Sequence, residues 1–475
     1  MGQARLRGSF ENRKKAAIKR NMDLLIGGLG GRDEQLMTML GRGIRPFISK
    51  LTKEEWQARR VRIIESLKGH PEPTNLEKAK PIRIRDDEIG WYLFLCEQTI
   101  ENPLCIDIAQ AQRILPFFVG IGERWGHSQK VEGIDRKITE LLSHYKSAPD
   151  GIIFEILVAL SYAAKGWNVE FLMEEPPAKS PDMVIRKGGV EFVVECKRLD
   201  RRTTYSEKER KEFLRIWDAT VPVLIKNRQW LWLKVVFHNE VSTLPTDFLV
   251  QVLESSLPIE DKETILHDSD DATIHARLID HLSVNSHLDK FMVKMPSPMM
   301  NYLLGGDWAP ENSEVTIVNL MKTIEMRYCE IPILGSYIES IDWACGITRK
   351  FDSEVSINKK ARDITKLLSD AVKQVPQYKP SIIHIAAETL EGRDVELRRT
   401  EKVMLKIPSF VTEKPVVAVR FHRFQSNSRI NLLYEFDETV EKFQIDGIIL
   451  EDIPTQVVVP EHVKKVDGRH WEVYD

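Results

Sequence analysis

The sequence predicts an α/β protein, and residues 151–240 carry that prediction within a chain of 475 residues. Residues 151–166 have the apolar pattern of a helix that closes at Gly166. Three runs typical of strands follow, at 167–173, 182–187 and 190–197. A charged helical stretch at 203–227 then leads to the run 229–238, in which both alternating sets of side chains are apolar. A strand of that kind belongs inside a sheet that helices cover on both faces.

Changes of pattern along the chain predict four regions. Residues 1–147 are expected to be mainly helical, and residues 148–240 to form the α-β-β-β-α-β core. Residues 241–376 are expected to be mixed but mostly helical, with an exposed acidic connection at 254–271. Residues 377–475 are expected to form an α/β region, either as an independent unit or as an extension of the core sheet. Its strands are expected at 381–387, 416–424 and 430–436, around a helix near 391–407.

Composition excludes several classes of protein. The formal net charge is −3, from 68 basic and 71 acidic residues, so any contact with phosphate must come from a local patch. The five cysteines are scattered and never in CxxC spacing, which argues against a zinc finger or a disulfide scaffold and favours a reducing compartment. No run approaches the roughly 20 apolar residues of a membrane span. A cytoplasmic protein without membrane contact is therefore expected.

The segment 180–199 contains a β-hairpin signal that fixes a register. Gly188-Gly189 suits a two-residue turn, because both positions of a type I′ turn need positive φ. Counting outward pairs Lys187 with Val190, Arg186 with Glu191, Ile185 with Phe192, Val184 with Val193, Met183 with Val194 and Asp182 with Glu195. Side chains alternate across a strand, so one face of this hairpin is wholly apolar. The other face is expected to place Asp182 opposite Glu195, with Lys197 beside them.

Two directly opposed carboxylates destabilise a sheet, so a purely structural hairpin should avoid this arrangement. A divalent cation resolves the repulsion, since Mg²⁺ prefers carboxylate oxygens and keeps several waters for a substrate phosphate. A lysine beside the cation is suited to hold a water or to offset charge that develops on phosphorus. The residues Asp182, Glu195 and Lys197 therefore predict a site of phosphate chemistry.

Pro181-Asp182 and Glu195-Cys196-Lys197, in the α-β-β-β-α-β order, resemble the PD-(D/E)XK nuclease superfamily, which has the restriction-endonuclease-like fold. The resemblance covers about residues 150–240. The family also places a glutamate on the helix before the first strand, and Glu155 matches that position. Glu155 lies among apolar residues, where an acid is costly unless it is paired or bound to metal.

The resemblance implies a metal-dependent nuclease, most directly an endonuclease that hydrolyses phosphodiester bonds of double-stranded DNA. Asp182 and Glu195 would ligate Mg²⁺, with Mn²⁺ as a substitute, and the backbone carbonyl of Cys196 would be a further ligand. Lys197 would assist the attacking water, and Glu155 would contribute to the metal site. Cutting both strands at one place would favour a homodimer.

Basic residues after Lys197 support a polyanionic partner. Arg198, Arg201 and Arg202 are expected in the loop beyond the site, where backbone phosphates would pass, and Lys208 on the following helix. An ordinary solvated helix face accounts for the helical charges equally well. The histidines His384 and His422, in apolar C-terminal strands, are expected to be core groups with satisfied hydrogen bonds.

Three alternatives remain open on the sequence. The first is a catalytically silent nuclease-like protein that only binds nucleic acid or acts as a scaffold. The second is a nuclease that acts on RNA or on single strands. The third is that the C-terminal strands form an independent functional domain, to which the nuclease-like core is an accessory.

Overall fold

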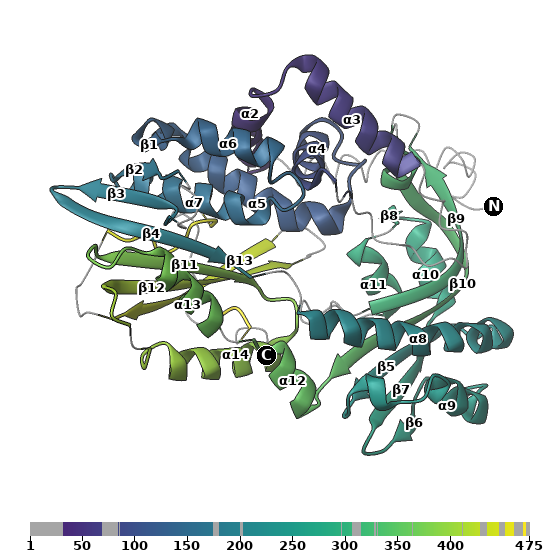
Figure 1. Cartoon of the computed structure of the whole chain (residues 1–475). Helices are drawn as coiled ribbons and strands as arrows, with labels where there is room; N and C mark the ends of the chain where they lie inside the picture. The colour runs from purple at the N-terminus through teal and green to yellow at the C-terminus, as the bar shows by residue number, and fades with distance from the viewer. Residues whose placement is uncertain are drawn as a thin grey trace.

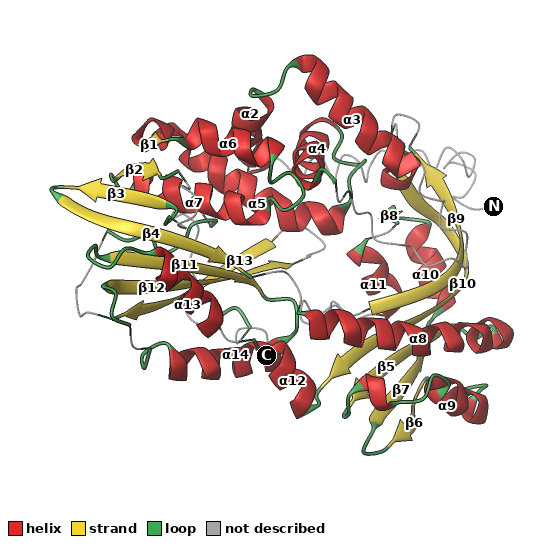
Figure 2. Cartoon of the chain, in the orientation of Figure 1, coloured by secondary structure: helices red, strands yellow, loops and turns green. Residues whose placement is uncertain are grey.

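The computed structural model has two mixed β-sheets with helices packed around them (Figures 1 and 2). It describes residues 32–68, 84, 86–173, 180–199, 203–295, 297–305, 315–326, 329, 331–362, 364–410, 412–427, 435–445, 452–459 and 469–471. The α/β class predicted from the sequence is confirmed. No helix in these ranges is both long enough and apolar enough to cross a membrane.

The N-terminal region is mainly helical, as predicted, over the part of residues 1–147 that the structure describes. Its helices are α2 (Arg32–Ile48), α3 (Lys53–Lys68), α4 (Glu88–Glu101), α5 (Ile108–Arg124) and α6 (Ile134–Ser143), with a short strand β1 (Val131–Glu132). Asp87 and Asp107 cap α4 and α5 by accepting hydrogen bonds from the backbone N–H groups of Gly90 and Gln110. The helices bury aromatic side chains such as Trp91 against α7 (Asp150–Ala164), so they cover one face of the first sheet.

The first sheet has seven strands in the order β1-β2-β3-β4-β11-β12-β13. Its longer strands are β2 (Asn168–Phe171), β3 (Met183–Lys187), β4 (Val190–Arg198), β11 (Ser381–Glu388), β12 (Val416–Asn427) and β13 (Glu435–Gln444). Strands β2, β3 and β4 pair antiparallel, whereas β4, β11 and β12 pair parallel. The chain leaves this sheet after β4 and returns to it only at β11.

The hairpin register predicted from Gly188-Gly189 is confirmed through the pair Met183–Val194. Both glycines have positive φ, at 57° and 82°. The apolar hairpin face, which includes Ile185 and Phe192, packs in the core that contains α7. The opposite face packs Val184 and Val193 against α13 (Thr365–Gln374). Helices therefore cover both faces of the sheet around the hairpin.

The prediction that the run 229–238 joins the hairpin sheet is wrong. The strand exists as β5 (Leu231–Phe237), but it lies in a second sheet of six strands, between β7 and β10. Helix α8 (Thr204–Asn227) covers one of its faces, with Phe213 and Trp217 packed against Leu233. Trp232 on the other face packs into a separate cluster with Ile338. The two-faced burial was predicted correctly, but that pattern does not specify which strands are the neighbours.

Residues 241–376 are mixed, as predicted, but their described part is not mostly helical. The region supplies five strands of the second sheet: β6 (Glu263–Asp268), β7 (Ala272–Leu278), β8 (Val293–Lys294), β9 (Val315–Glu325) and β10 (Ser336–Phe351). Its helices are α9 (Phe248–Ser256), α10 (His281–Leu288), α11 (Pro298–Gly305), α12 (Glu354–Lys360) and α13. The acidic stretch 254–271 is not a plain connection, because it contains the edge strand β6. Acidic side chains on an edge strand are solvated, so an acid-rich run can form a strand as well as a connection.

The C-terminal region extends the first sheet, which was one of the two predicted arrangements. Strands β11 and β12 and helix α14 (Arg393–Lys406) lie close to their predicted positions. The strand expected at 430–436 lies mostly outside the described residues, and the described strand is β13. The parallel partner of β4 is therefore supplied by the helix–strand pair α13–β11, not by α8–β5.

Candidate active site

The predicted site residues lie at the end of the β3–β4 hairpin remote from its turn. Asp182 directly precedes β3, and its Oδ2 accepts a hydrogen bond from the backbone N–H of Cys196 at 2.6 Å. The backbone carbonyl of Asp182 accepts from the N–H of Leu172, the residue after β2, at 3.0 Å. These two bonds fix Asp182 beside the Glu195-Cys196-Lys197 segment of β4. Asp182 therefore lies beside the segment of β4 that carries Glu195 and Lys197, as predicted.

Glu195 is the most deeply buried acid of this group, with an exposed fraction of 0%. Its Oε1 accepts a hydrogen bond from Nζ of Lys197, two residues along the same strand face. Its Oε2 is buried and has no hydrogen-bond partner among the described residues. A buried carboxylate oxygen without a partner is costly, so a cation or a hydrogen-bond donor at that oxygen would be stabilising.

Glu155 reaches the same group from α7, where it was expected, but it also has a partner that the sequence did not reveal. Nζ of Lys137, on α6, lies 2.6 Å from Oε2 of Glu155. The Lys137 ammonium also lies 5.6 Å from the ring centroid of Phe171. Both charged side chains are largely buried. The improbable acid in an apolar helix was a signal that a cation must be nearby, but nothing in the sequence identified Lys137 as that cation.

Burial and mutual repulsion perturb the acids of this site. The pKa of Glu195 and that of Glu155 are each raised to about 8, chiefly by burial and then by the negative charge of Asp182. Lys197 opposes this effect for both residues. Burial is the largest single effect and lowers the pKa of Lys197, but the charge and hydrogen bond of Glu195 together with the charge of Asp182 outweigh it, so the net pKa is raised. Burial and the neighbouring carboxylate of Asp182 therefore disfavour the ionised forms of Glu155 and Glu195.

The residues fit a metal site with two carboxylate ligands. Asp182 and Glu195 suit Mg²⁺, which proteins commonly hold through one or two carboxylates plus substrate phosphate and waters. The unpartnered Oε2 of Glu195 is the observation in favour. The described part of the chain contains no group of three or more His, Cys, Asp or Glu side chains that could hold a metal ion. The ligand role expected for Glu155 and for the Cys196 carbonyl therefore stays a prediction.

The predicted phosphate-binding residues have different outcomes. Arg198 is the last residue of β4 and does not lie in the following loop, so that expectation is wrong. Its side chain is 5% exposed and forms an ion pair with Glu388 of β11 at 2.6 Å. The charged group of Arg198 therefore lies in the protein interior. Arg201 and Arg202 lie outside the described residues. Lys208 is exposed on α8, as expected.

The cluster that holds Arg198 was not anticipated. Glu388 also accepts three hydrogen bonds from Arg113 of α5, at 2.8, 2.9 and 3.2 Å. Arg113 in turn lies 2.5 Å from Asp150, the first residue of α7. The Arg198 guanidinium stacks over Phe117, 4.9 Å from the ring centroid. This cluster ties α5, α7, β4 and β11 together next to the candidate site.

A second buried chain of polar groups crosses the sheet beside Cys196. The hydroxyl of Tyr162, on α7, lies 2.9 Å from Nε2 of His384, whose Nδ1 lies 2.9 Å from Nε2 of His422. Nδ1 of His422 lies 3.0 Å from Oε1 of Glu438. All of these side chains are buried. The expectation that both histidines are satisfied core groups is confirmed.

Comparisons with protein-family models, with curated proteins and with solved structures gave no match. Any assignment of function therefore rests on the chemistry of the site.

Proposed function

We propose that the protein is a metal-dependent nuclease that hydrolyses phosphodiester bonds, most directly an endonuclease acting on DNA. The single observation that carries the proposal is the grouping of Asp182, buried Glu195 and Lys197 at one end of the hairpin, with Oε2 of Glu195 unpartnered among the described residues. A cation bound between Asp182 and Glu195 would give that oxygen a partner.

The strand order around the site supports the restriction-endonuclease-like core. Helix α7, the antiparallel strands β2, β3 and β4, and the pair α13–β11, with β11 parallel to β4, reproduce the α-β-β-β-α-β order. The remaining segment between β4 and α13, which contains all six strands of the second sheet, is then an insertion into that core. Fold alone does not establish activity, so the side chains must carry the argument.

The roles of the side chains follow from their contacts. A bound Mg²⁺ would supply charge stabilisation and an activated water at Asp182 and Glu195. The backbone N–H of Cys196 holds the Asp182 carboxylate in one orientation. Lys197, now paired with Glu195, would donate to a phosphate oxygen and offset its developing charge. Lys137 balances Glu155, which limits the repulsion in the site.

The nucleic-acid partner is proposed from charge. Lys208 is exposed on α8, and the segment 199–203, which joins β4 to α8, includes Arg201 and Arg202. Lysine and arginine contacts of this kind position a backbone without reading its sequence. Cleavage of both strands at one place would use two copies of the chain.

A catalytically silent binding protein is the second candidate, and one observation favours it. Lys137 and Lys197 already pair with Glu155 and Glu195, so two of the three acids are balanced without metal. A binding protein would hold DNA equally well with Mg²⁺ or EDTA and would never cut it.

A plasmid-nicking assay on the full chain, with Mg²⁺, Mn²⁺ or EDTA, tests the proposal. Cleavage with either metal and none with EDTA is the expected result. Equal DNA binding under all three conditions, with no cleavage of duplex, single-stranded DNA or RNA, would favour the silent protein.

A further inference from the structure

Two cysteines that are far apart in the sequence meet where the helical N-terminal region contacts the second sheet. Cys105 lies in the connection between α4 and α5 and is 2% exposed. Cys329 lies between β9 and β10 and is partly exposed. A side-chain hydrogen bond joins the two thiols. Sγ of Cys329 also lies 3.1 Å from the carbonyl oxygen of Ile331, so this thiol has a fixed position in the cluster.

A buried lysine brings the same two connections together. Nζ of Lys294, the last residue of β8, donates a hydrogen bond to the carbonyl oxygen of Leu104 at 2.9 Å and another to that of Leu334. Leu104 directly precedes the first cysteine in the chain. A Cβ at Gly335, the residue after Leu334, would lie 2.9 Å from Sγ of Cys329. One ammonium group thus links the backbone beside both thiols.

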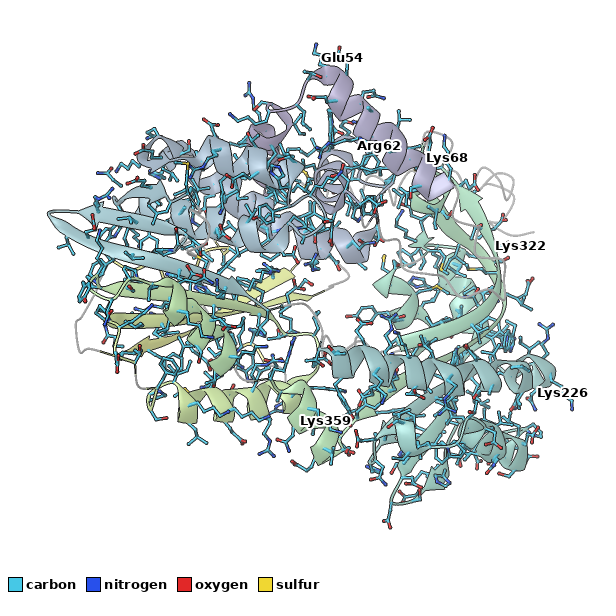
Figure 3. The ribbon with its side chains drawn as sticks, viewed as in Figure 1. Glu54, Arg62, Lys68, Lys226, Lys322 and Lys359 are labelled. Carbon is cyan, nitrogen blue, oxygen red and sulfur yellow. The ribbon has the colours of Figure 1, made fainter. Side chains whose placement is uncertain are left out.

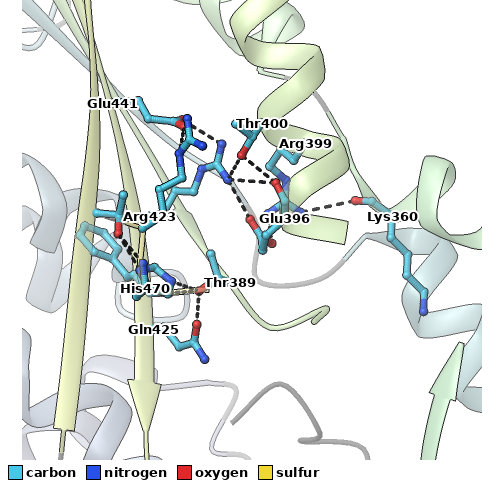
Figure 4. A network of polar contacts seen from close by, with 12 residues as sticks. Lys360, Thr389, Glu396, Arg399, Thr400, Arg423, Gln425, Glu441 and His470 are labelled. Atoms are coloured by element: carbon cyan, nitrogen blue, oxygen red, sulfur yellow. Dashed lines mark hydrogen bonds and ion pairs between the residues drawn. The ribbon is translucent and has the colours of Figure 1, made fainter. Parts of the chain in front are cut away.

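The charge of Lys294 lacks the acidic partner that a buried cation normally has. The residue is 3% exposed, and in the described part of the chain its Nζ contacts two carbonyl oxygens and the ring of Tyr337 but forms no ion pair with a carboxylate. By contrast, the fully buried Arg423 bonds to both Glu396 and Glu441 (Figure 4). A buried charge is costly unless an opposite charge balances it. An anion close to Lys294 would therefore be stabilising.

The thiols are the groups that can supply this anion. Burial lowers the pKa of Lys294 to about 8, and the charges of Cys105 and Cys329 oppose that effect more than the charge of Asp107 does. The pKa of Cys105 is raised, chiefly by its hydrogen bond to Cys329 and then by burial. Cys105 therefore keeps its proton. Cys329, the more exposed of the two, is left as the thiol that can react as a thiolate.

We infer that Cys105 and Cys329 form a redox-active dithiol, which a small disulfide such as glutathione disulfide oxidises. The Cys329 thiolate attacks one sulfur of the small disulfide, forms a mixed disulfide and releases the other half as a thiolate. That thiolate takes the proton of Cys105, and the Cys105 sulfur then displaces the second half from Cys329. The dithiol loses two electrons and two protons. The small disulfide becomes two thiols, one of which takes its proton from solvent.

The new disulfide would tie the α4–α5 connection to the β9–β10 connection. A cross-link between distant segments of a chain restricts the unfolded state and so stabilises the fold. Oxidation would therefore secure the second sheet to the helical region, and reduction would release that link. The hairpin-site residues take no part, so this inference does not depend on the nuclease proposal.

Counting thiols in the full chain after incubation with excess glutathione disulfide tests the inference. The chain has five cysteines, so five thiols should react in urea before oxidation and two fewer after it. Peptide mass mapping should find Cys105 joined to Cys329, and dithiothreitol should restore all five thiols. Five thiols after oxidation, a glutathione that stays on Cys329, or a loss confined to Cys96, Cys196 and Cys345 would overturn the inference.

Single cysteine variants assign the two roles. Cys105→Ser should retain glutathione on Cys329, because no second thiol displaces it. Cys329→Ser should take up glutathione at least about tenfold more slowly than Cys105→Ser, because Cys105 is buried and keeps its proton. Equal rates of uptake by the two variants would contradict the role of Cys329 as the attacking thiol.

The variant Lys294→Met removes the cation and keeps a side chain of similar length. Loss of a neighbouring opposite charge typically raises a pKa by about 1 unit or more, which lowers the thiolate fraction about tenfold. Each remaining thiolate gains about threefold in nucleophilicity, so the disulfide should form at least about threefold more slowly at neutral pH. Lys226→Met, at an exposed lysine near the end of α8 (Figure 3), is the control and should oxidise as the wild type does. Equal rates in the two folded variants would refute the role of Lys294.

Discussion

Asp182 accepts a hydrogen bond from the backbone N–H of Cys196 at 2.6 Å, although 14 residues separate them in the chain. The bond closes the open end of the β3–β4 hairpin just beyond its last ladder pair, Met183–Val194. It orients the carboxylate of Asp182 toward the strand that carries Glu195 and Lys197. This hydrogen bond therefore fixes the position of the Asp182 carboxylate in the candidate site.

The buried cluster around Glu388 should contribute strongly to stability. Glu388→Ala would leave Arg113 and Arg198 buried without their shared carboxylate. Breaking a buried pair in this way typically costs about 3–5 kcal/mol. Urea unfolding should show that loss, whereas Glu401→Ala, which removes an exposed partner of Arg398, should cost less than about 0.5 kcal/mol. Equal midpoints for the two variants would contradict the assigned role of Glu388.

The polar chain that starts at Tyr162 should stabilise the sheet through its hydrogen bonds. Tyr162→Phe removes the hydroxyl that meets Nε2 of His384 at 2.9 Å and leaves a buried ring nitrogen without that partner. A loss of about 1–3 kcal/mol in the free energy of unfolding is expected. Tyr145→Phe, at a tyrosine that is 44% exposed, is the control and should have little effect. An unchanged free energy of unfolding in Tyr162→Phe would show that this hydrogen bond does not stabilise the protein.

Stability should depend on pH through the two buried glutamates. The folded pKa of Glu155 and that of Glu195 are each raised to about 8, above the ordinary value of 4.5. Between these values the folded state binds more protons than the unfolded state, so the free energy of unfolding should fall as pH rises from about 4.5 to 8. The slope should reach at most about 1.4 kcal/mol per pH unit for each glutamate. Urea titrations across this range measure it.

Removing one titrating group should reduce that slope. Glu195→Gln keeps the shape of the side chain and eliminates its charge, so its curve should be flatter than that of the wild type. Saturating Mg²⁺ should flatten the wild-type curve in the same way, because a bound cation favours the ionised carboxylates. A wild-type stability that rises with pH over this interval would contradict the assigned pKa directions.

The hairpin register was predictable because its determinants are local. A Gly-Gly turn and strict alternation fix which side chains face each other, and the pairs through Met183–Val194 followed. The position of Glu155 on the preceding helix was predictable for the same reason. The strand at β5 was also found, but its partners β7 and β10 were not, since burial on both faces says only that a strand is covered.

The ion-pair partners of the charged residues could not be predicted from local sequence patterns. Arg198 directly follows Glu195-Cys196-Lys197 and was expected to contact phosphate, yet its partner Glu388 lies 190 residues further along the chain. Lys137 meets Glu155 only because α6 packs on α7. Such contacts depend on how helices and strands assemble, and no spacing in the sequence encodes them.

The most direct test of the central claim is the rate of plasmid nicking with Mg²⁺ by the double variant Asp182→Ala, Lys197→Ala, measured beside Lys226→Ala. Loss of one charge-stabilising group at such a centre typically costs about 10²–10³ in rate, so the double variant should lose at least that much. Circular dichroism should show that it remains folded, and Lys226→Ala should nick at the wild-type rate. Metal-dependent nicking by the folded double variant at the wild-type rate would contradict the assignment of the hairpin site.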